Sequence, residues 1–121
     1  MPKKILVVED DKNLNDIYKT ILTSHGYTVL TAFDGSKALD LIGSAQLDLL
    51  LLDMNLPRLG GLEVLRRARS DKLALPPTII FSNQELPDEI DEAYRLGASR
   101  YLLKAWASPK ELASVVAETL A

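Results

Sequence analysis

The sequence contains no cysteine, and its one histidine is His25. Without cysteine this chain forms no disulfide, uses no thiol in catalysis and holds no metal through thiolates. A single histidine argues against a site built from several histidine ligands and against a Ser-His-Asp triad. Any chemistry must therefore come from carboxylates, hydroxyls, amides and ammonium groups.

Basic charge and long apolar runs are also scarce. The net charge is −3 and the isoelectric point is about 5.1, whereas domains that bind nucleic acid are usually basic. No apolar run approaches the ~20 residues of a membrane-spanning helix. The start, MPKKILVVEDD, has four apolar residues before its acids, too few for a signal peptide. We therefore expect a cytoplasmic protein without a direct nucleic-acid or membrane partner.

The chain is long enough for one domain with a hydrophobic core. It has 121 residues, of which 47% are hydrophobic and 26% are charged, as in ordinary globular domains. Apolar runs alternate with helical stripes five times. The strands are expected at residues 5–8, 27–32, 48–53, 77–82 and 99–103. This alternation predicts one α/β domain over residues 1–121, with a parallel sheet covered on both faces by helices.

Several residues mark where the expected helices begin and end. Gly26 is a natural residue to follow the end of the first helix. Asp34 is expected to cap the second helix, and Asp11 the first. Ser108 and Glu111 form a capping box around a proline at the first helical position, which predicts the start of the last helix.

Polar residues follow four of the five expected strands. Glu9-Asp10-Asp11 follows the first, Asp53 ends the third, Ser82 ends the fourth and Lys104 follows the fifth. Taken singly, each has an ordinary structural explanation as a cap, a turn residue, a local hydrogen-bonding group or a lysine reaching solvent. Because functional crevices of open parallel sheets lie beyond the carboxyl ends of the strands, neighbouring strands would bring these groups into one crevice.

Such a crevice needs a cation. Two like charges about 4 Å apart repel by roughly 4 kcal/mol at an effective dielectric constant of about 20. Glu9, Asp10 and Asp53 together carry −3, which Lys104 and one divalent ion would neutralise. Oxygen ligands without histidine or cysteine favour a hard ion, Mg²⁺ (or Mn²⁺) before Ca²⁺. A carboxylate beside a metal, a lysine and a hydroxyl is suited to attack phosphorus, so Asp53 is the expected nucleophile, with Glu9 and Asp10 on the metal.

Five motifs together resemble the receiver domain of two-component response regulators, in particular single-domain regulators of the chemotaxis type. They are ILVVEDD, DLLLLDMNLPRLGGLEVL, TIIFSN, GASRYLLK and SPKEL, in this order along nearly the whole chain. The resemblance implies a flavodoxin-like, doubly wound five-stranded parallel sheet in the order 2-1-3-4-5 with five helices. It also implies a phosphoacceptor signalling domain that assists its own phosphotransfer and autodephosphorylation but is not an enzyme in the usual sense.

The resemblance assigns roles to individual residues. A phosphohistidine on a sensor kinase or phosphotransfer protein would donate its phosphoryl group to Asp53. Asp10 would bind the metal directly, Glu9 through water, and Asn55 through its backbone carbonyl. Two residues, Ser82 and Lys104, would bind phosphoryl oxygens. Tyr101 matches an aromatic residue whose rotamer changes with the shift of the Ser82 hydroxyl, and the response would be read on the fourth helix, fifth strand and fifth helix.

The chain departs from the family pattern at three positions. Ser82 stands where threonine is common, which keeps the hydroxyl. Asn83 replaces a smaller residue, and we expect its bulk to narrow access to Asp53. Ala105 replaces the proline that usually follows the lysine, so we expect a trans Lys104–Ala105 bond, because a cis bond without proline costs about 2.5–4 kcal/mol. Asn55 and Gln84 occupy positions that tune phosphoryl lifetime in the family.

Three other functions fit parts of the sequence less well. A pseudo-receiver would bind partners without phosphorylation, but such domains usually lose the aspartate, the lysine or the acidic pair. A phosphatase of the haloacid-dehalogenase type would need a second acid where Asn55 stands. A flavodoxin-like flavin carrier would place small hydroxyl residues in its first loop, whereas Glu9-Asp10-Asp11 would repel a phosphate.

The expected partners are proteins. They are a histidine kinase or phosphotransfer protein and a downstream target bound in trans, with the chain itself a monomer or weak dimer. Trp106, the only tryptophan, and the last helix are the expected contact surface for the target.

Overall fold

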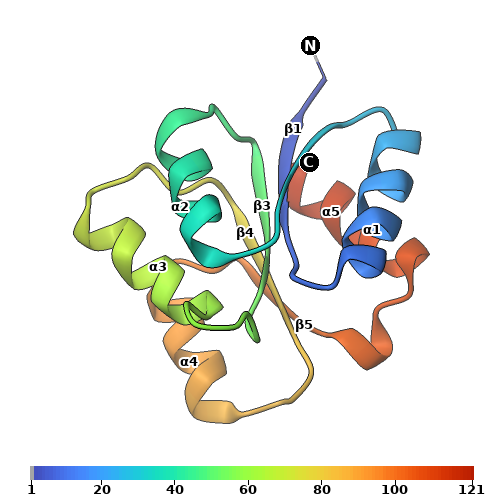
Figure 1. Cartoon of the computed structure of the whole chain (residues 1–121). Helices are drawn as coiled ribbons and strands as arrows, with labels where there is room; N and C mark the ends of the chain where they lie inside the picture. The colour runs from blue at the N-terminus through green and yellow to red at the C-terminus, as the bar shows by residue number, and fades with distance from the viewer. Residues whose placement is uncertain (1) are drawn as a thin grey trace.

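Five parallel strands form one sheet in the order β2-β1-β3-β4-β5 (Figure 1). The computed structural model describes residues 2–121, with the side chain of Trp106 left out. The strands are β1 (Lys4–Val8), β2 (Thr28–Ala32), β3 (Leu49–Asp53), β4 (Thr78–Ser82) and β5 (Arg100–Leu103). The predicted fold class and strand order are confirmed, and each strand boundary lies within one residue of its expected position.

Two layers of helices cover the sheet, as predicted. The helices are α1 (Lys12–Ser24), α2 (Gly35–Ser44), α3 (Gly61–Ser70), α4 (Pro87–Arg95) and α5 (Pro109–Leu120), with a short 3-10 turn, η1 (Lys104–Trp106), between β5 and α5. Figure 1 shows α1 and α5 on one face and α2, α3 and α4 on the other. A parallel sheet of this kind is buried on both faces, so its central strands are apolar throughout.

The run of four leucines in β3 shows how the two faces divide. Leu49 and Leu51 belong to the core under α1 and α5, and Leu50 and Leu52 belong to the core under α2, α3 and α4. All four are completely buried. Since side chains alternate along a strand, one uninterrupted apolar run supplies both cores at once.

The predicted helix boundaries are confirmed by side-chain caps. The carboxylate of Asp11 accepts a hydrogen bond from the backbone N–H of Leu14, and Asp34 caps α2 in the same way. The Ser108 hydroxyl accepts from the N–H of Glu111 at 3.2 Å. Gly26 follows α1 with φ +90°, a left-handed conformation that glycine adopts without strain.

The Lys104–Ala105 peptide bond is trans, as expected, since the described residues include no cis bond. The chain leaves β5 through η1 and reaches Ser108, the cap of α5. No helix in residues 2–121 combines the length and apolar character needed to cross a membrane.

Gly61 lets the start of α3 pack directly on the end of β3. A Cβ atom at this position would lie 2.7 Å from the backbone oxygen of Asp53 and 2.9 Å from Cα of Met54. Neither atom can move without displacing the strand that carries Asp53. The close packing of α3 therefore fixes the strand end at which the polar groups gather.

We predict that Gly61→Ala lowers the free energy of unfolding by about 1–3 kcal/mol, the usual cost of overpacking. Urea denaturation provides the measurement, and Gly43→Ala is the matched control. Gly43 lies inside α2, and its Cβ would meet only Leu73 side-chain atoms at 3.6 Å or more, so alanine there should be neutral or stabilising. Equal effects of the two substitutions would contradict this account.

Candidate functional site

The polar groups predicted from the sequence do meet at the carboxyl ends of the strands. Asp53 pairs in register with Phe81 of β4, and Val8, the last residue of β1, pairs with Leu52 of β3. Glu9 follows β1 directly and Lys104 follows β5 directly. The strand order therefore brings together residues that are up to 95 positions apart in the sequence.

Lys104 forms the centre of the site. Its Nζ donates to Oε1 of Glu9 at 2.7 Å and to Oδ2 of Asp53 at 2.9 Å. Both carboxylates are 1% exposed, and the lysine side chain is 17% exposed. Burying an unpaired charge costs free energy, and the ammonium group of Lys104 compensates the charge of the two buried carboxylates. Lys104 is thus held inward and does not extend into solvent.

Phe81 lies beneath this ion pair and was not predicted as a site residue. Its ring centroid lies 5.1 Å from Nζ of Lys104, a distance at which a cation and an aromatic face attract. The ring in turn packs edge-to-face against Tyr18. The Lys104 ammonium therefore lies over an aromatic face at the edge of the core.

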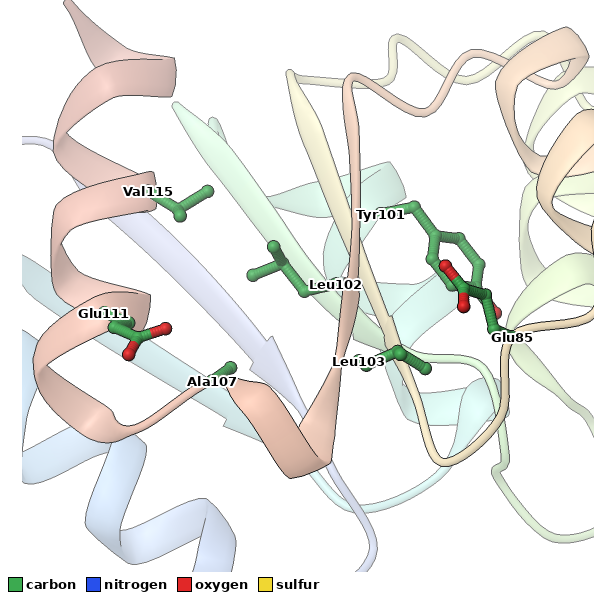
Figure 2. A pocket seen from close by; sticks show the side chains of 7 residues that line it. All are labelled: Glu85, Tyr101, Leu102, Leu103, Ala107, Glu111 and Val115. Atoms are coloured by element: carbon green, nitrogen blue, oxygen red, sulfur yellow. The ribbon is translucent and has the colours of Figure 1, made fainter.

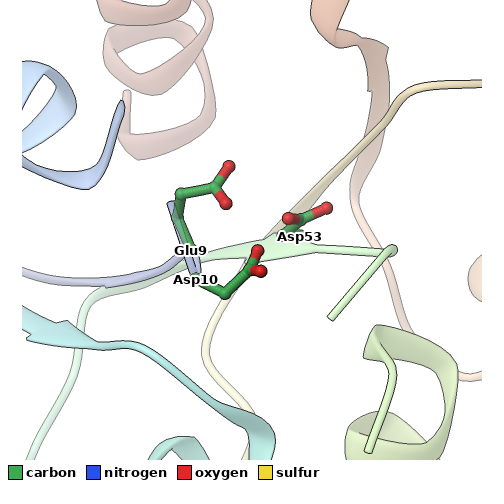
Figure 3. Close-up of side chains that lie close together, drawn as sticks. All are labelled: Glu9, Asp10 and Asp53. Atoms are coloured by element: carbon green, nitrogen blue, oxygen red, sulfur yellow. The ribbon is translucent and has the colours of Figure 1, made fainter. Parts of the chain in front are cut away.

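Glu9, Asp10 and Asp53 form a carboxylate cluster. Oxygen atoms of the three side chains lie within 4.8 Å of one another, and Figure 3 shows the three converging from β1 and β3. Glu9 and Asp53 are buried, whereas Asp10 is exposed at the rim. Several carboxylate oxygens close to one another are the donor set that a hard divalent cation requires.

Burial and the neighbouring charges shift the pKa values of Glu9 and Lys104. Burial raises the pKa of Glu9 to about 7, although its hydrogen bonds with Lys104 and the Asp11 N–H oppose the shift. Burial acts to lower the pKa of Lys104, but the hydrogen bonds and charges of Glu9 and Asp53 outweigh it and the pKa is raised. The lysine therefore stays protonated, while the acids compete for its single charge.

Asn15, which was not predicted, fixes the loop that carries Glu9. Its side-chain amide donates to the backbone oxygens of Glu9 at 3.0 Å and of Ala32 at 3.2 Å. The residue is 2% exposed. Asn15 lies beside Leu14 and Tyr18 on the apolar face of α1. A buried asparagine needs hydrogen-bond partners, so this position in the sequence could have identified it.

Asn55 connects Asp53 to the end of β4. Its backbone N–H donates to Oδ1 of Asp53 at 2.9 Å. Its side-chain oxygen accepts from the Ser82 hydroxyl at 3.2 Å and from the Asn83 N–H at 3.0 Å. The Ser82 hydroxyl also accepts from the N–H of Gln84 at 3.3 Å. Ser82 is thus buried beside the site with its proton directed to Asn55.

Tyr101 extends this network to the edge of the sheet. Its hydroxyl donates to the backbone oxygen of Gln84 at 3.0 Å, and its partly buried ring packs on the core under α4. The side chains of Asn83 and Gln84 are exposed. Whether Asn83 restricts access to Asp53 stays a prediction, and the Trp106 side chain lies outside the described part of the chain.

Comparison with known proteins identifies the family. The profile of the response regulator receiver domain matches residues 5–117. The chain belongs to this family. Receiver domains are signalling modules of two-component systems, and the predicted resemblance is therefore confirmed.

The related proteins agree with this assignment. Response regulator MprA of Mycolicibacterium vanbaalenii is 39% identical over 113 residues, which cover 93% of this chain and 48% of that protein. The alkaline phosphatase synthesis transcriptional regulatory protein PhoP of Bacillus subtilis is 38% identical over 112 residues, covering 93% of this chain and 46% of that protein. This receiver domain spans about half the length of the curated relatives it matches.

A solved receiver structure superimposes over nearly the whole chain. It is a CheY-like response regulator receiver domain protein from Methanospirillum hungatei, with a TM-score of 0.90 and 28% sequence identity. The match covers 99% of this chain and 94% of that one. The fold and family are therefore shown independently by sequence and by structure.

We predict that Lys104→Met lowers the free energy of unfolding at neutral pH by about 1–3 kcal/mol, since it leaves buried carboxylates without their partner. Chemical denaturation measures the change. Lys110→Met, at an exposed position on α5, is the matched control and should have little effect. Adding Asp53→Asn to Lys104→Met should restore part of the lost free energy of unfolding. If the double variant is as unstable as Lys104→Met alone, the ion-pair explanation is wrong.

Proposed function

We propose that the chain is a single receiver unit that accepts a phosphoryl group on Asp53 and signals this through α4, β5 and α5. The observation that carries the proposal is the pairing of Lys104 with both Glu9 and Asp53, with Asp10 beside them. A buried carboxylate that faces a fixed cation and an acidic cluster is equipped to bind a phosphoryl group.

Glu9, Asp10, Asp53 and the backbone carbonyl of Asn55 would hold Mg²⁺, with Mn²⁺ as a substitute. The chemistry of the donors supports this, because all are oxygens and three are carboxylates. No hydrogen-bond donor within the described residues occupies the Asn55 carbonyl. When bound, the ion would neutralise charge on the phosphoryl oxygens.

In the proposed reaction, a carboxylate oxygen of Asp53 attacks the phosphorus of a phosphohistidine. A P–O bond forms, the P–N bond breaks, and its electron pair stays on the imidazole nitrogen; because the other ring nitrogen carries a proton, the ring leaves as neutral imidazole. Lys104 is already 2.9 Å from Asp53, so its ammonium can bind a phosphoryl oxygen with little movement. Catalysis of this kind rests on positioning and electrostatic stabilisation.

Ser82 would supply the switch. Its hydroxyl donates to Asn55 in this structure, and a phosphoryl oxygen on Asp53 would be a stronger, charged acceptor. If the hydroxyl turns to the phosphoryl group, its bond to Asn55 breaks and the Gln84 N–H loses its acceptor, whereas the Asn83 N–H still donates to Asn55. Tyr101, which donates to the Gln84 backbone, would then change its position. This movement would shift the equilibrium between two conformations of the α4-β5-α5 face.

The pseudo-receiver remains the alternative function, because binding without phosphorylation needs none of this chemistry. The expected partners are a histidine kinase or phosphotransfer protein and a downstream protein target. The expectation that no nucleic acid is bound finds no support in the relatives, since one is named a transcriptional regulatory protein. A cytoplasmic location and a monomeric or weakly dimeric state stay predictions.

The proposed function is tested by adding beryllofluoride, a phosphoryl mimic, with Mg²⁺ and following the fluorescence of Trp106. Wild type should respond saturably and only with metal present, and Asp53→Asn should not respond. Acetyl phosphate should add to wild type one phosphoryl group that hydroxylamine removes, detectable as a mass increase. If Asp53→Asn matches wild type in both measurements, the phosphoacceptor function is wrong and the pseudo-receiver is favoured.

We further predict that Asn55→Ala binds beryllofluoride about 2- to 10-fold more tightly than wild type. The variant removes the ground-state acceptor of Ser82, and one hydrogen bond contributes about 0.5–1.5 kcal/mol. The backbone groups of Asn55 remain. Ser82→Ala, which removes the donor itself, should bind more weakly. Weaker binding by both variants would show that Asn55 does not restrain Ser82 in the unphosphorylated state.

A further inference from the structure

A groove of about 290 Å³ lies along β5, between the start of α5 and the loop that leads to α4 (Figure 2). Its apolar lining comes from Leu102, Leu103, Ala107 and Val115. β5 is an edge strand, with β4 as its neighbour on one side only. The groove is therefore open to a partner along the free edge of the sheet.

Two carboxylates border this apolar surface. Figure 2 shows Glu111 on α5 at one side of β5 and Glu85 at the other. Both residues are exposed. Among the described residues, no lysine or arginine lies within ion-pair distance of either one. The groove thus offers an apolar centre with an unneutralised negative charge on each side.

The neighbouring helix adds negative charge. The helix α4 (Pro87–Arg95), PDEIDEAYR, contains four acidic residues and one arginine. Only Glu92 of these acids is in an ion pair within the described residues, with Arg66 of α3. This excess of negative charge favours a basic occupant and would repel nucleic acid.

We propose that the groove binds a short basic segment of a partner protein, with one or two aliphatic side chains in the centre and lysine or arginine on both sides. The volume suits a few apolar side chains, since pockets for small molecules start at roughly 300 Å³. The flanking cations would meet Glu85 and Glu111. This inference rests on the proposed signalling face and adds the chemistry of the partner that the face recognises.

The test uses a synthetic peptide with two central leucines flanked by lysines, titrated into ¹⁵N-labelled, unphosphorylated protein without metal. The expected amide shifts are concentrated at Leu102, Leu103, Ala107 and Val115. The double variant Glu85→Gln/Glu111→Gln should weaken binding by about 2- to 30-fold, the range for the loss of two exposed ion pairs. The same peptide with glutamates in place of lysines should not bind.

The control is Asp40→Asn/Asp71→Asn, which changes the net charge equally at exposed positions on α2 and after α3. It should leave the affinity within about 2-fold of wild type. Equal weakening by both double variants, shifts located elsewhere, or concentration-dependent self-association through the groove would each overturn the proposal. The titration is repeated with Mg²⁺ and beryllofluoride. If the peptide binds neither form while the beryllofluoride response is normal, the proposed groove is wrong and the proposed function is unaffected.

Discussion

The ion pair of Lys104 with Glu9 and Asp53 is the interaction on which the site depends. It joins the ends of β1, β3 and β5 through one ammonium group, with donor-acceptor distances of 2.7 and 2.9 Å. Glu9 and Asp53 share this single cation and Asp10 lies beside them, so the cluster carries more acidic groups than the lysine can neutralise. Uncompensated charge lowers the stability of the fold, but it also attracts a metal ion, which in turn helps to bind a phosphoryl group. Functional sites often reduce stability in this way.

The remaining polar contacts extend outward from this ion pair. Asn55 connects Asp53 to Ser82, and the turn after β4 reaches Tyr101 through the backbone of Gln84. These bonds form a continuous route from the buried carboxylate to the edge strand β5. A change in the partner of Ser82 is therefore a local event with a physical connection to the surface where we propose that a basic partner segment binds.

The strands, the helix caps and the polar residues after four strands were predicted from local patterns, whereas the strand order that brings these residues together came from the family resemblance. The LLLL run, the caps at Asp34 and Ser108, and polar residues after four strands are visible without coordinates. Contacts of Asn15, Phe81 and the Asn55 side chain were not predicted. An amide or aromatic side chain finds its partner only after α1, β4 and the loop after β3 are placed together, and no spacing in the sequence encodes that placement.

The most direct test of the account is a crystal structure of the chain with Mg²⁺ and beryllofluoride. We predict beryllium on the carboxylate of Asp53, with Nζ of Lys104 and Oγ of Ser82 both within hydrogen-bond distance of fluorine. The bond from Ser82 to Asn55, 3.2 Å in the present structure, should be broken. A complex in which Ser82 still donates to Asn55, or in which Lys104 contacts only Glu9, would contradict the account.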